Sequence, residues 1–261
     1  KQGYITGKSK GKTQLTVRTY NGVTAQITVR VQNKALPLNA NAAQLALDHK
    51  HVTQVVYGKS VQNRNLEGYI ITPTNGKYKK TLFIDFAIHG FEDDYARDGQ
   101  RLTAIANHLI AHFASHPKEL GNYRLVIVPC ANPDGAISGK NAFGRCTAAH
   151  VDINRDFGPF KGKETRALRD FILRSKPNVY INAHGWLNET LGTKKLCQIV
   201  NRTLHLNKMK DGVYAANEGY AIGWVHKKLN IPCCLLEYKA PNALHTKDNV
   251  RMIREIIKAY A

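Results

Sequence analysis

The chain has 261 residues, and 38 Lys and Arg against 19 Asp and Glu give it a formal net charge of +19 at pH 7. Because 43% of its residues are hydrophobic, it can bury a sizeable core, which excludes disorder of the whole chain. No stretch approaches the ~18 consecutive apolar residues of a transmembrane helix, so we expect no membrane span. The positive charge suits nucleic acids, anionic cell-wall polymers and acidic substrates alike.

The N-terminal residues differ in pattern from the rest of the chain. Residues 14–20 and 23–31 alternate polar and apolar side chains, with Asn21-Gly22 between them, which is a strong signal for a β-hairpin. Because two strands cannot bury a core alone, this segment must dock on something or belong to a truncated domain. Together with the run 3–13, it resembles the C-terminal strands of a bacterial immunoglobulin-like (Ig-like) repeat of secreted proteins. We therefore predict two domains, residues 1–33 and 34–261.

From residue 35 onward, apolar strands alternate with amphipathic helices, which predicts an α/β domain. The predicted strands are 68–72, 81–88, 123–129, 178–183 and 231–236. The predicted helices are 101–115, 163–175, 214–229 and 248–260. Polar and ionisable residues follow several of the strands, at the edge where open α/β sheets place their sites.

Three of these strand ends carry groups that bind metals or transfer protons. His89-Gly90-Phe91-Glu92 follows the strand 81–88, and a His with a carboxylate three residues later supplies half of a catalytic zinc site. His184 ends the strand 178–183 and could supply a third ligand. Glu237 ends the strand 231–236, where a carboxylate is costly unless it is paired or used. Taken singly, two of these signals have an alternative. The His-x-x-Glu pattern also arises by chance in many proteins, and His184 could be a histidine of the core with a hydrogen-bonded ring.

Two further motifs lie between these strands: the turn sequence Asn132-Pro133-Asp134-Gly135, and the run Val-Asp-Ile-Asn-Arg-Asp-Phe at 151–157. In this order, the motifs resemble the zinc carboxypeptidase family of the carboxypeptidase A/B type, in its bacterial branch. The resemblance covers roughly residues 40–260, including Tyr-Gly-Lys-Ser at 57–60 and Arg64. It implies a three-layer α/β/α fold with a mixed, mostly parallel central sheet, beside the N-terminal hairpin.

The resemblance also implies a metal site. His89, Glu92 and His184 would bind one Zn²⁺ per chain, and Asp152 would orient a ligating imidazole. Glu237 would be the general base that takes a proton from the attacking water and later gives it to the leaving amine.

By the same resemblance, Arg145 would stabilise the oxyanion, and Asn154 and Arg155 would bind the terminal carboxylate of the substrate. Arg145 lies only nine positions before Asn154, a shorter spacing than in the animal enzymes. For the tyrosine that covers the substrate, Tyr214 fits the family spacing better than Tyr220.

The cysteines do not indicate a cellular compartment. Their number is five, so at least one thiol is free. Cys130 and Cys146 flank the Asn-Pro-Asp-Gly turn and could form a disulfide in an oxidising compartment, or remain thiols. Cys233 and Cys234 lie in an apolar strand and are expected to pack as small hydrophobic side chains.

The function that we expect is that of a secreted or surface-attached bacterial zinc metallopeptidase, monomeric, which releases a residue with a free carboxylate. Its expected substrate is the stem peptide of peptidoglycan, and the alternative is an ordinary L-peptide. An amino-acid deacylase is disfavoured, because only 24 residues follow Glu237 and that branch adds a β-rich domain there. A non-catalytic wall-binding module is disfavoured because ligands and base are all present. The basic residues are dispersed and no nucleic-acid motif occurs, so we expect no nucleic-acid partner.

Overall fold

The computed structural model describes residues 11–31, 49–92, 97–139, 144–212, 219–239 and 246–261. The chain forms two compact units, Lys1–Pro37 and Leu38–Ala261. None of the described helices is long and apolar enough to cross a membrane.

The first unit contains the predicted hairpin. Strands β1 (Gly11–Arg18) and β2 (Thr24–Val31) pair antiparallel, with Leu15 opposite Ile27. Gly22 turns the chain with φ +87°, in the left-handed region that favours glycine. Val17 and Ile27 remain about half exposed within the described residues (46% and 48%), as expected for two strands without a core.

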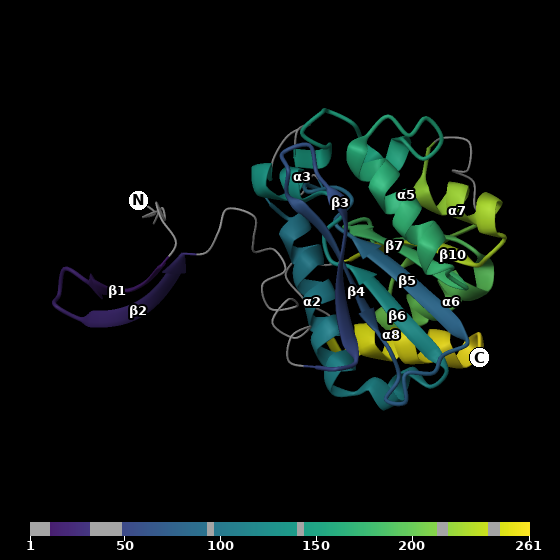
Figure 1. Ribbon diagram of the computed structural model, residues 1–261, viewed down its shortest axis with the longest axis horizontal. Helices are drawn as coiled ribbons and strands as arrows, with labels where there is room; N and C mark the ends of the chain where they lie inside the picture. The colour runs from purple at the N-terminus through teal and green to yellow at the C-terminus, as the bar shows by residue number, and fades with distance from the viewer. Residues whose placement is uncertain (1–10, 32–48, 93–96, 140–143, 213–218, 240–245) are drawn as a thin grey trace. The chain divides into compact units, whose positions relative to one another are not determined.

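The second unit is built on an eight-stranded sheet (Figure 1). Its strands are, in order across the sheet, β3 (Val52–Lys59), β4 (Asn65–Ile71), β6 (Tyr123–Val128), β5 (Lys80–Phe86), β7 (Val179–Gly185), β10 (Cys233–Tyr238), β8 (Glu189–Gly192) and β9 (Lys208–Asp211). The four central strands β6, β5, β7 and β10 run parallel, and antiparallel strands flank them.

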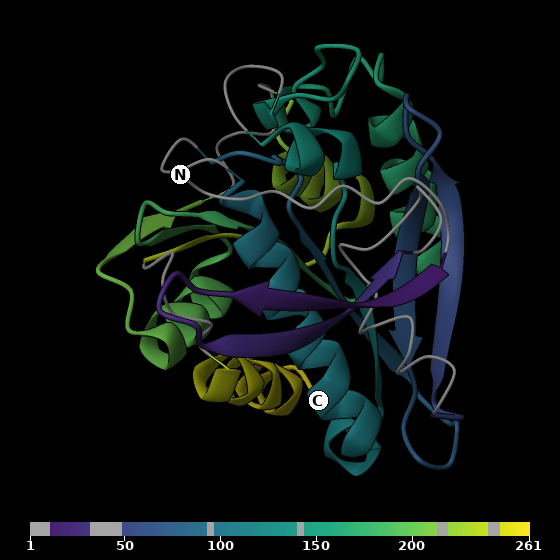
Figure 2. The same ribbon diagram turned by 90° about the vertical axis from the view of Figure 1, so that its left-hand side faces the viewer.

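Helices cover both faces of this sheet (Figures 1 and 2). One face packs against α2 (Gly99–Ser115), α6 (Lys194–Leu204) and α8 (Thr246–Ala259). The other packs against α5 (Lys163–Ser175) and α7 (Ala221–Leu229). The short helices α3 (Pro133–Ser138), η1 (Pro117–Leu120) and η2 (Ile153–Arg155) lie in the connections. The predicted three-layer fold with a mixed central sheet is therefore confirmed.

Side chains along the central strands point alternately to the two faces of the sheet, which determines which residues pack in each core and which lie at the site. Leu82, Ile84 and Phe86 of β5 belong to the core under α2, α6 and α8, whereas Phe83 packs toward α5. Because successive side chains of a strand point to opposite faces, Asp85 lies on the same face as Phe83. By the same alternation, His184 of β7 lies on the face that α5 and α7 cover.

The structure corrects several predicted boundaries. The strand predicted at 81–88 ends at Phe86, because Ala87 has φ +49° and leaves the extended conformation. Within the described residues, the helix predicted at 214–229 begins at Ala221.

The prediction also missed β3, α3, α6, β8 and β9. Strands β8 and β9 have four residues each, too few to show alternation. Helix α6 buries Leu196, Val200 and Thr203 at helical spacing, a pattern that was present in the sequence.

Candidate metal centre and active site

The candidate site lies at the carboxyl ends of β5, β7 and β10, three neighbouring parallel strands. From β5 the chain continues through α2 to β6 on one side, whereas β7 lies on the other side. This reversal of strand order makes the β5–β7 boundary a topological switch point, where open α/β sheets bind their ligands.

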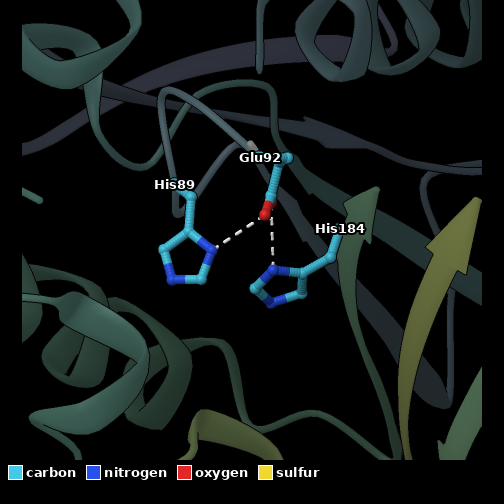
Figure 3. Close-up of side chains that lie close together, drawn as sticks. All are labelled: His89, Glu92 and His184. Carbon is cyan, nitrogen blue, oxygen red and sulfur yellow. Dashed lines mark hydrogen bonds and ion pairs between the residues drawn. The ribbon is translucent and has the colours of Figure 1, made fainter. Parts of the chain in front are cut away.

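His89, Glu92 and His184 meet at this boundary (Figure 3). The Glu92 carboxylate lies between the two imidazoles, with Oε2 2.9 Å from His89 Nδ1 and Oε1 3.1 Å from His184 Nδ1. One donor atom from each residue falls within 4.8 Å of the others. All three side chains are buried.

These donors fit a zinc ion. Two imidazole nitrogens and one carboxylate oxygen form a common ligand set of catalytic zinc sites. The Glu92 carboxylate contacts Nδ1 of both imidazoles, so the three residues converge on one point, as a shared cation requires. Glu92 supplies the negative charge that a cation requires, since burial raises its pKa but the two histidines lower it to about 2.

Close packing holds the His89–Glu92 segment. A Cβ atom on Gly90 would lie 2.0 Å from the backbone N of Ala136, so no larger residue fits without a shift. Asp98, just before α2, accepts a hydrogen bond from the Glu92 backbone N–H at 2.7 Å and from Trp186 Nε1 at 3.2 Å. The sequence analysis did not identify Asp98, because its contacts depend on the course of the chain after Glu92.

Asp152 contacts the second nitrogen of His89. Its Oδ1 is 3.0 Å from His89 Nε2, and its Oδ2 accepts from Arg145 Nε at 3.3 Å. Burial lowers the pKa of His89, but the carboxylates of Glu92 and Asp152 raise it to about 9. Asp152 is therefore placed to orient His89, with Nδ1 toward the other ligands.

Glu237 lies beside His184, its register neighbour on the adjacent strand. Only 9% of the residue is exposed, and burial raises the pKa of its carboxyl group to about 7. Its Oε2 atom is buried without a hydrogen-bond partner among the described residues. A bound cation would lower this pKa, because positive charge favours the carboxylate.

A cavity of about 220 Å³ joins these groups to the predicted substrate-binding residues. It is lined by His89, Glu92, Arg145, Asn154, Arg155, His184, Gly185, Leu187, Tyr220, Leu235 and Glu237. The Arg155 guanidinium stacks 4.2 Å from the centre of the Tyr220 ring. Tyr220 therefore lies at the cavity, whereas Tyr214, the preferred candidate, lies outside the described residues.

The Asn-Pro-Asp-Gly turn has a structural place beside the site. Asn132 Nδ2 donates to the carbonyl oxygens of Arg145 and Cys146, at 3.3 and 2.9 Å, and so holds the chain at Arg145. Asp134 is buried and accepts from Ser60 Oγ at 2.8 Å and Arg64 at 2.5 Å.

All five cysteines are free thiols. The disulfide left open between Cys130 and Cys146 is not formed, and Cys233 and Cys234 are buried as small side chains. Cys234 instead lies near Cys197, with 3.8 Å between the two sulfur atoms.

Comparison with known proteins decides the family. Residues 38–190 match the zinc carboxypeptidase family. The chain belongs to the zinc carboxypeptidase family. Members of this family use zinc, in agreement with the His–Glu–His site, so the predicted family and cofactor are confirmed.

A curated relative of this zinc carboxypeptidase domain is bacteriocin BCN5 of Clostridium perfringens, 31% identical over 248 residues. The match covers 84% of the chain but only 27% of that relative, so the chain spans about a quarter of its length.

Solved structures share the fold at low sequence identity. A metallo-carboxypeptidase of Burkholderia cenocepacia is 15% identical with a TM-score of 0.68, and the match covers 95% of this chain and 78% of that one. A murein-tripeptide amidase of Escherichia coli O157 is 17% identical with a TM-score of 0.57, over 78% of this chain and 91% of that one.

Proposed function

We propose that this chain is a secreted or wall-associated metallocarboxypeptidase whose substrates are the stem peptides of peptidoglycan. The reaction would hydrolyse a peptide bond next to a residue with a free carboxylate. One observation carries the proposal: a buried carboxylate oxygen without a partner among the described residues, Glu237 Oε2, lines the same cavity as the His–Glu–His ligand set and two arginines.

His89, Glu92 and His184 would hold the zinc ion. Zinc bound by three protein ligands lowers the pKa of water from 15.7 to about 7 and polarises a carbonyl oxygen. Asp152 would orient His89 for this role by accepting a hydrogen bond from its Nε2–H group.

Glu237 would transfer the proton in both halves of the reaction. As a carboxylate, it takes a proton from the attacking water. As the resulting acid, it gives that proton to the nitrogen of the leaving amine, so that it ends the cycle ionised. Burial raises the pKa of Glu237 to about 7, and the bound cation would lower it from there, so that Glu237 would be an ionised base near neutral pH.

The arginines would bind the anionic parts of the substrate. Arg155 offers a planar guanidinium for the terminal carboxylate, and Arg145 a positive charge for the oxyanion. Asn154 accepts from the Ala221 backbone N–H through Oδ1 at 3.0 Å, so that its amide N–H₂ group is turned away from Ala221. In this orientation the amide of Asn154 can act as a hydrogen-bond donor at the cavity.

The wall substrate has independent support. A net charge of +19 favours approach to anionic wall polymers. The relative from Clostridium perfringens is named a bacteriocin, and an action against bacteria suits a substrate in their envelope. A structural neighbour is named a murein-tripeptide amidase. The Ig-like interpretation of residues 1–33 supports an extracellular location.

The test is mass spectrometry of the products from defined tri-, tetra- and pentapeptide stems, with ordinary L-peptides beside them. We expect cleavage of the stems by the zinc-loaded protein. Cleavage of L-peptides alone would replace the wall substrate by a general carboxypeptidase activity. A protein that binds zinc and hydrolyses neither would refute the enzymatic function and favour a binding module.

The Glu237→Gln variant separates the reaction from metal binding. We expect kcat to fall about 10²- to 10⁴-fold, because the amide cannot accept the proton. Zinc content should stay at one per chain, measured by metal analysis. Full activity of this variant would contradict the role of Glu237.

A further inference from the structure

A buried carboxylate that makes no salt bridge within the described part of the chain lies on the strand next to that of His184. Asp85 is fully buried on β5, and Asn182 is its register neighbour on β7. Asn182 Nδ2 donates to Asp85 Oδ1 at 2.5 Å. Burial raises the pKa of this carboxyl group. The buried Tyr180 hydroxyl group also interacts with it and lowers that pKa, although it makes no hydrogen bond of ordinary geometry to Oδ2. Burying a carboxylate is costly, so its place beside a metal ligand calls for a function.

Asp85 determines which way the Asn182 amide faces. An ionised carboxylate only accepts hydrogen bonds, so the Asn182 N–H₂ group must point toward it. The amide oxygen then points to the other side. His184 lies two residues further along β7 and therefore on the same face, with its Nε2 2.6 Å from Asn182 Oδ1.

The amide oxygen in turn determines which nitrogen of His184 carries the proton. Because an amide oxygen only accepts, Nε2 must be the N–H donor in this contact. In the neutral imidazole Nδ1 then keeps its lone pair for a metal. Nδ1 lies 3.1 Å from Glu92 Oε1, so a cation bound between the two would replace the proton that this contact holds without a metal.

A competing contact makes this control necessary. Asn154 Nδ2 lies 3.4 Å from His184 Nε2, and its N–H₂ group faces His184 because Oδ1 accepts from Ala221. If the Asn182 amide also turned its N–H₂ group toward Nε2, two donors would face that nitrogen. The proton would then be favoured on Nδ1, and zinc could bind there only by displacing it.

We propose that Asp85 and Asn182 are positioning residues that hold the proton of His184 on Nε2 and so keep Nδ1 available for zinc. His89 receives the same control directly from the carboxylate of Asp152. For His184 the carboxylate of Asp85 acts through the side-chain amide of Asn182, which lies between them. The inference rests on the proposed zinc ligands and not on the identity of the substrate.

The test compares the zinc dissociation constants of variants, measured by competition with a chelator. Asp85→Leu and Asn182→Leu should each weaken zinc binding about 10- to 100-fold, the usual effect of losing the partner of a ligating histidine. Asp85→Asn tests the acceptor-only character of the carboxylate. Its amide can either accept from Asn182 or donate to it, so its zinc dissociation constant should lie between those of the wild type and Asp85→Leu. The double variant Asp85→Leu/Asn182→Leu should bind no more weakly than Asn182→Leu, because both changes remove the same contact.

A second measurement follows the Nε2 contact itself. In the zinc-loaded protein, where Nδ1 binds the metal and Nε2 carries the proton, long-range ¹H–¹⁵N spectra should show that the His184 Nε2–H proton exchanges with water more slowly in the wild type than in Asp85→Leu or Asn182→Leu. Equal exchange rates in the folded variants and the wild type would overturn the proposal, as would an unchanged zinc affinity in a folded Asp85→Leu protein. If these differences are found but the wild type cleaves no peptide, the proposed function fails and the positioning role stands.

Discussion

Replacement of Asp152 by Asn should weaken zinc binding about 5- to 12-fold. The Asn side chain has the same shape and still offers an oxygen to His89 Nε2, so the change keeps this contact and removes the charge that also faces Arg145. A hydrogen bond to a charged group contributes about 1.5–3 kcal/mol and a neutral one about 0.5–1.5 kcal/mol. The difference of about 1–1.5 kcal/mol gives this range, at 1.4 kcal/mol per factor of ten.

The assay is chelator competition at neutral pH, combined with thermal unfolding of the metal-free protein. Asp156→Asn is a matched control four residues away. The Asp156 carboxylate accepts from the backbone N–H groups of Lys161 and Gly162, at 2.9 and 2.7 Å. The Asp156→Asn variant should therefore lower the melting temperature of the protein without changing its zinc dissociation constant. Equal zinc constants for Asp152→Asn and the wild type, or equal losses in both variants, would refute the reasoning.

Three further expectations concern substrate binding, acid stability and the thiols. Tyr220→Ala should raise KM about 2- to 30-fold, because it removes a cation–π contact with Arg155 that contributes about 0.5–2 kcal/mol. Tyr220→Phe keeps the ring, so its KM should stay near that of the wild type. Equal KM values for the two variants would contradict this expectation. Partial burial raises the pKa of the Glu119 carboxyl group, but hydrogen bonds from Arg254 and His112 lower it below 4.5. The Glu119 carboxylate therefore contributes to stability above pH 4.5, and this contribution is lost as the pH falls through the lowered pKa. In urea unfolding, Glu119→Gln should therefore cost at most about 1 kcal/mol at neutral pH and nothing in strong acid, and a difference that persists in acid would point to another cause. Cys146 is the one partly exposed cysteine, so a thiol reagent should modify one cysteine of the native protein; rapid reaction of all five would show that the core opens.

Local patterns were sufficient to predict much of the fold and the candidate ligands. Alternation around Asn21-Gly22 predicted the hairpin, and the helix predicted at 163–175 has the same bounds as α5. His89, His184 and Glu237 stood out because each follows or ends an apolar strand, where an ionisable group conflicts with its surroundings. Such signals depend only on neighbours in the sequence, so they can be recognised without the fold.

Contacts between distant segments could not be predicted in this way. Asp85 and Asn182 are 97 residues apart, and they meet only because β5 and β7 pair in one register. A shift of that register by one residue would turn the Asn182 side chain to the other face of the sheet. Strand order and register are set by the packing of whole layers, so only the tertiary structure shows that a carboxylate inside the sheet lies behind a zinc ligand at its edge.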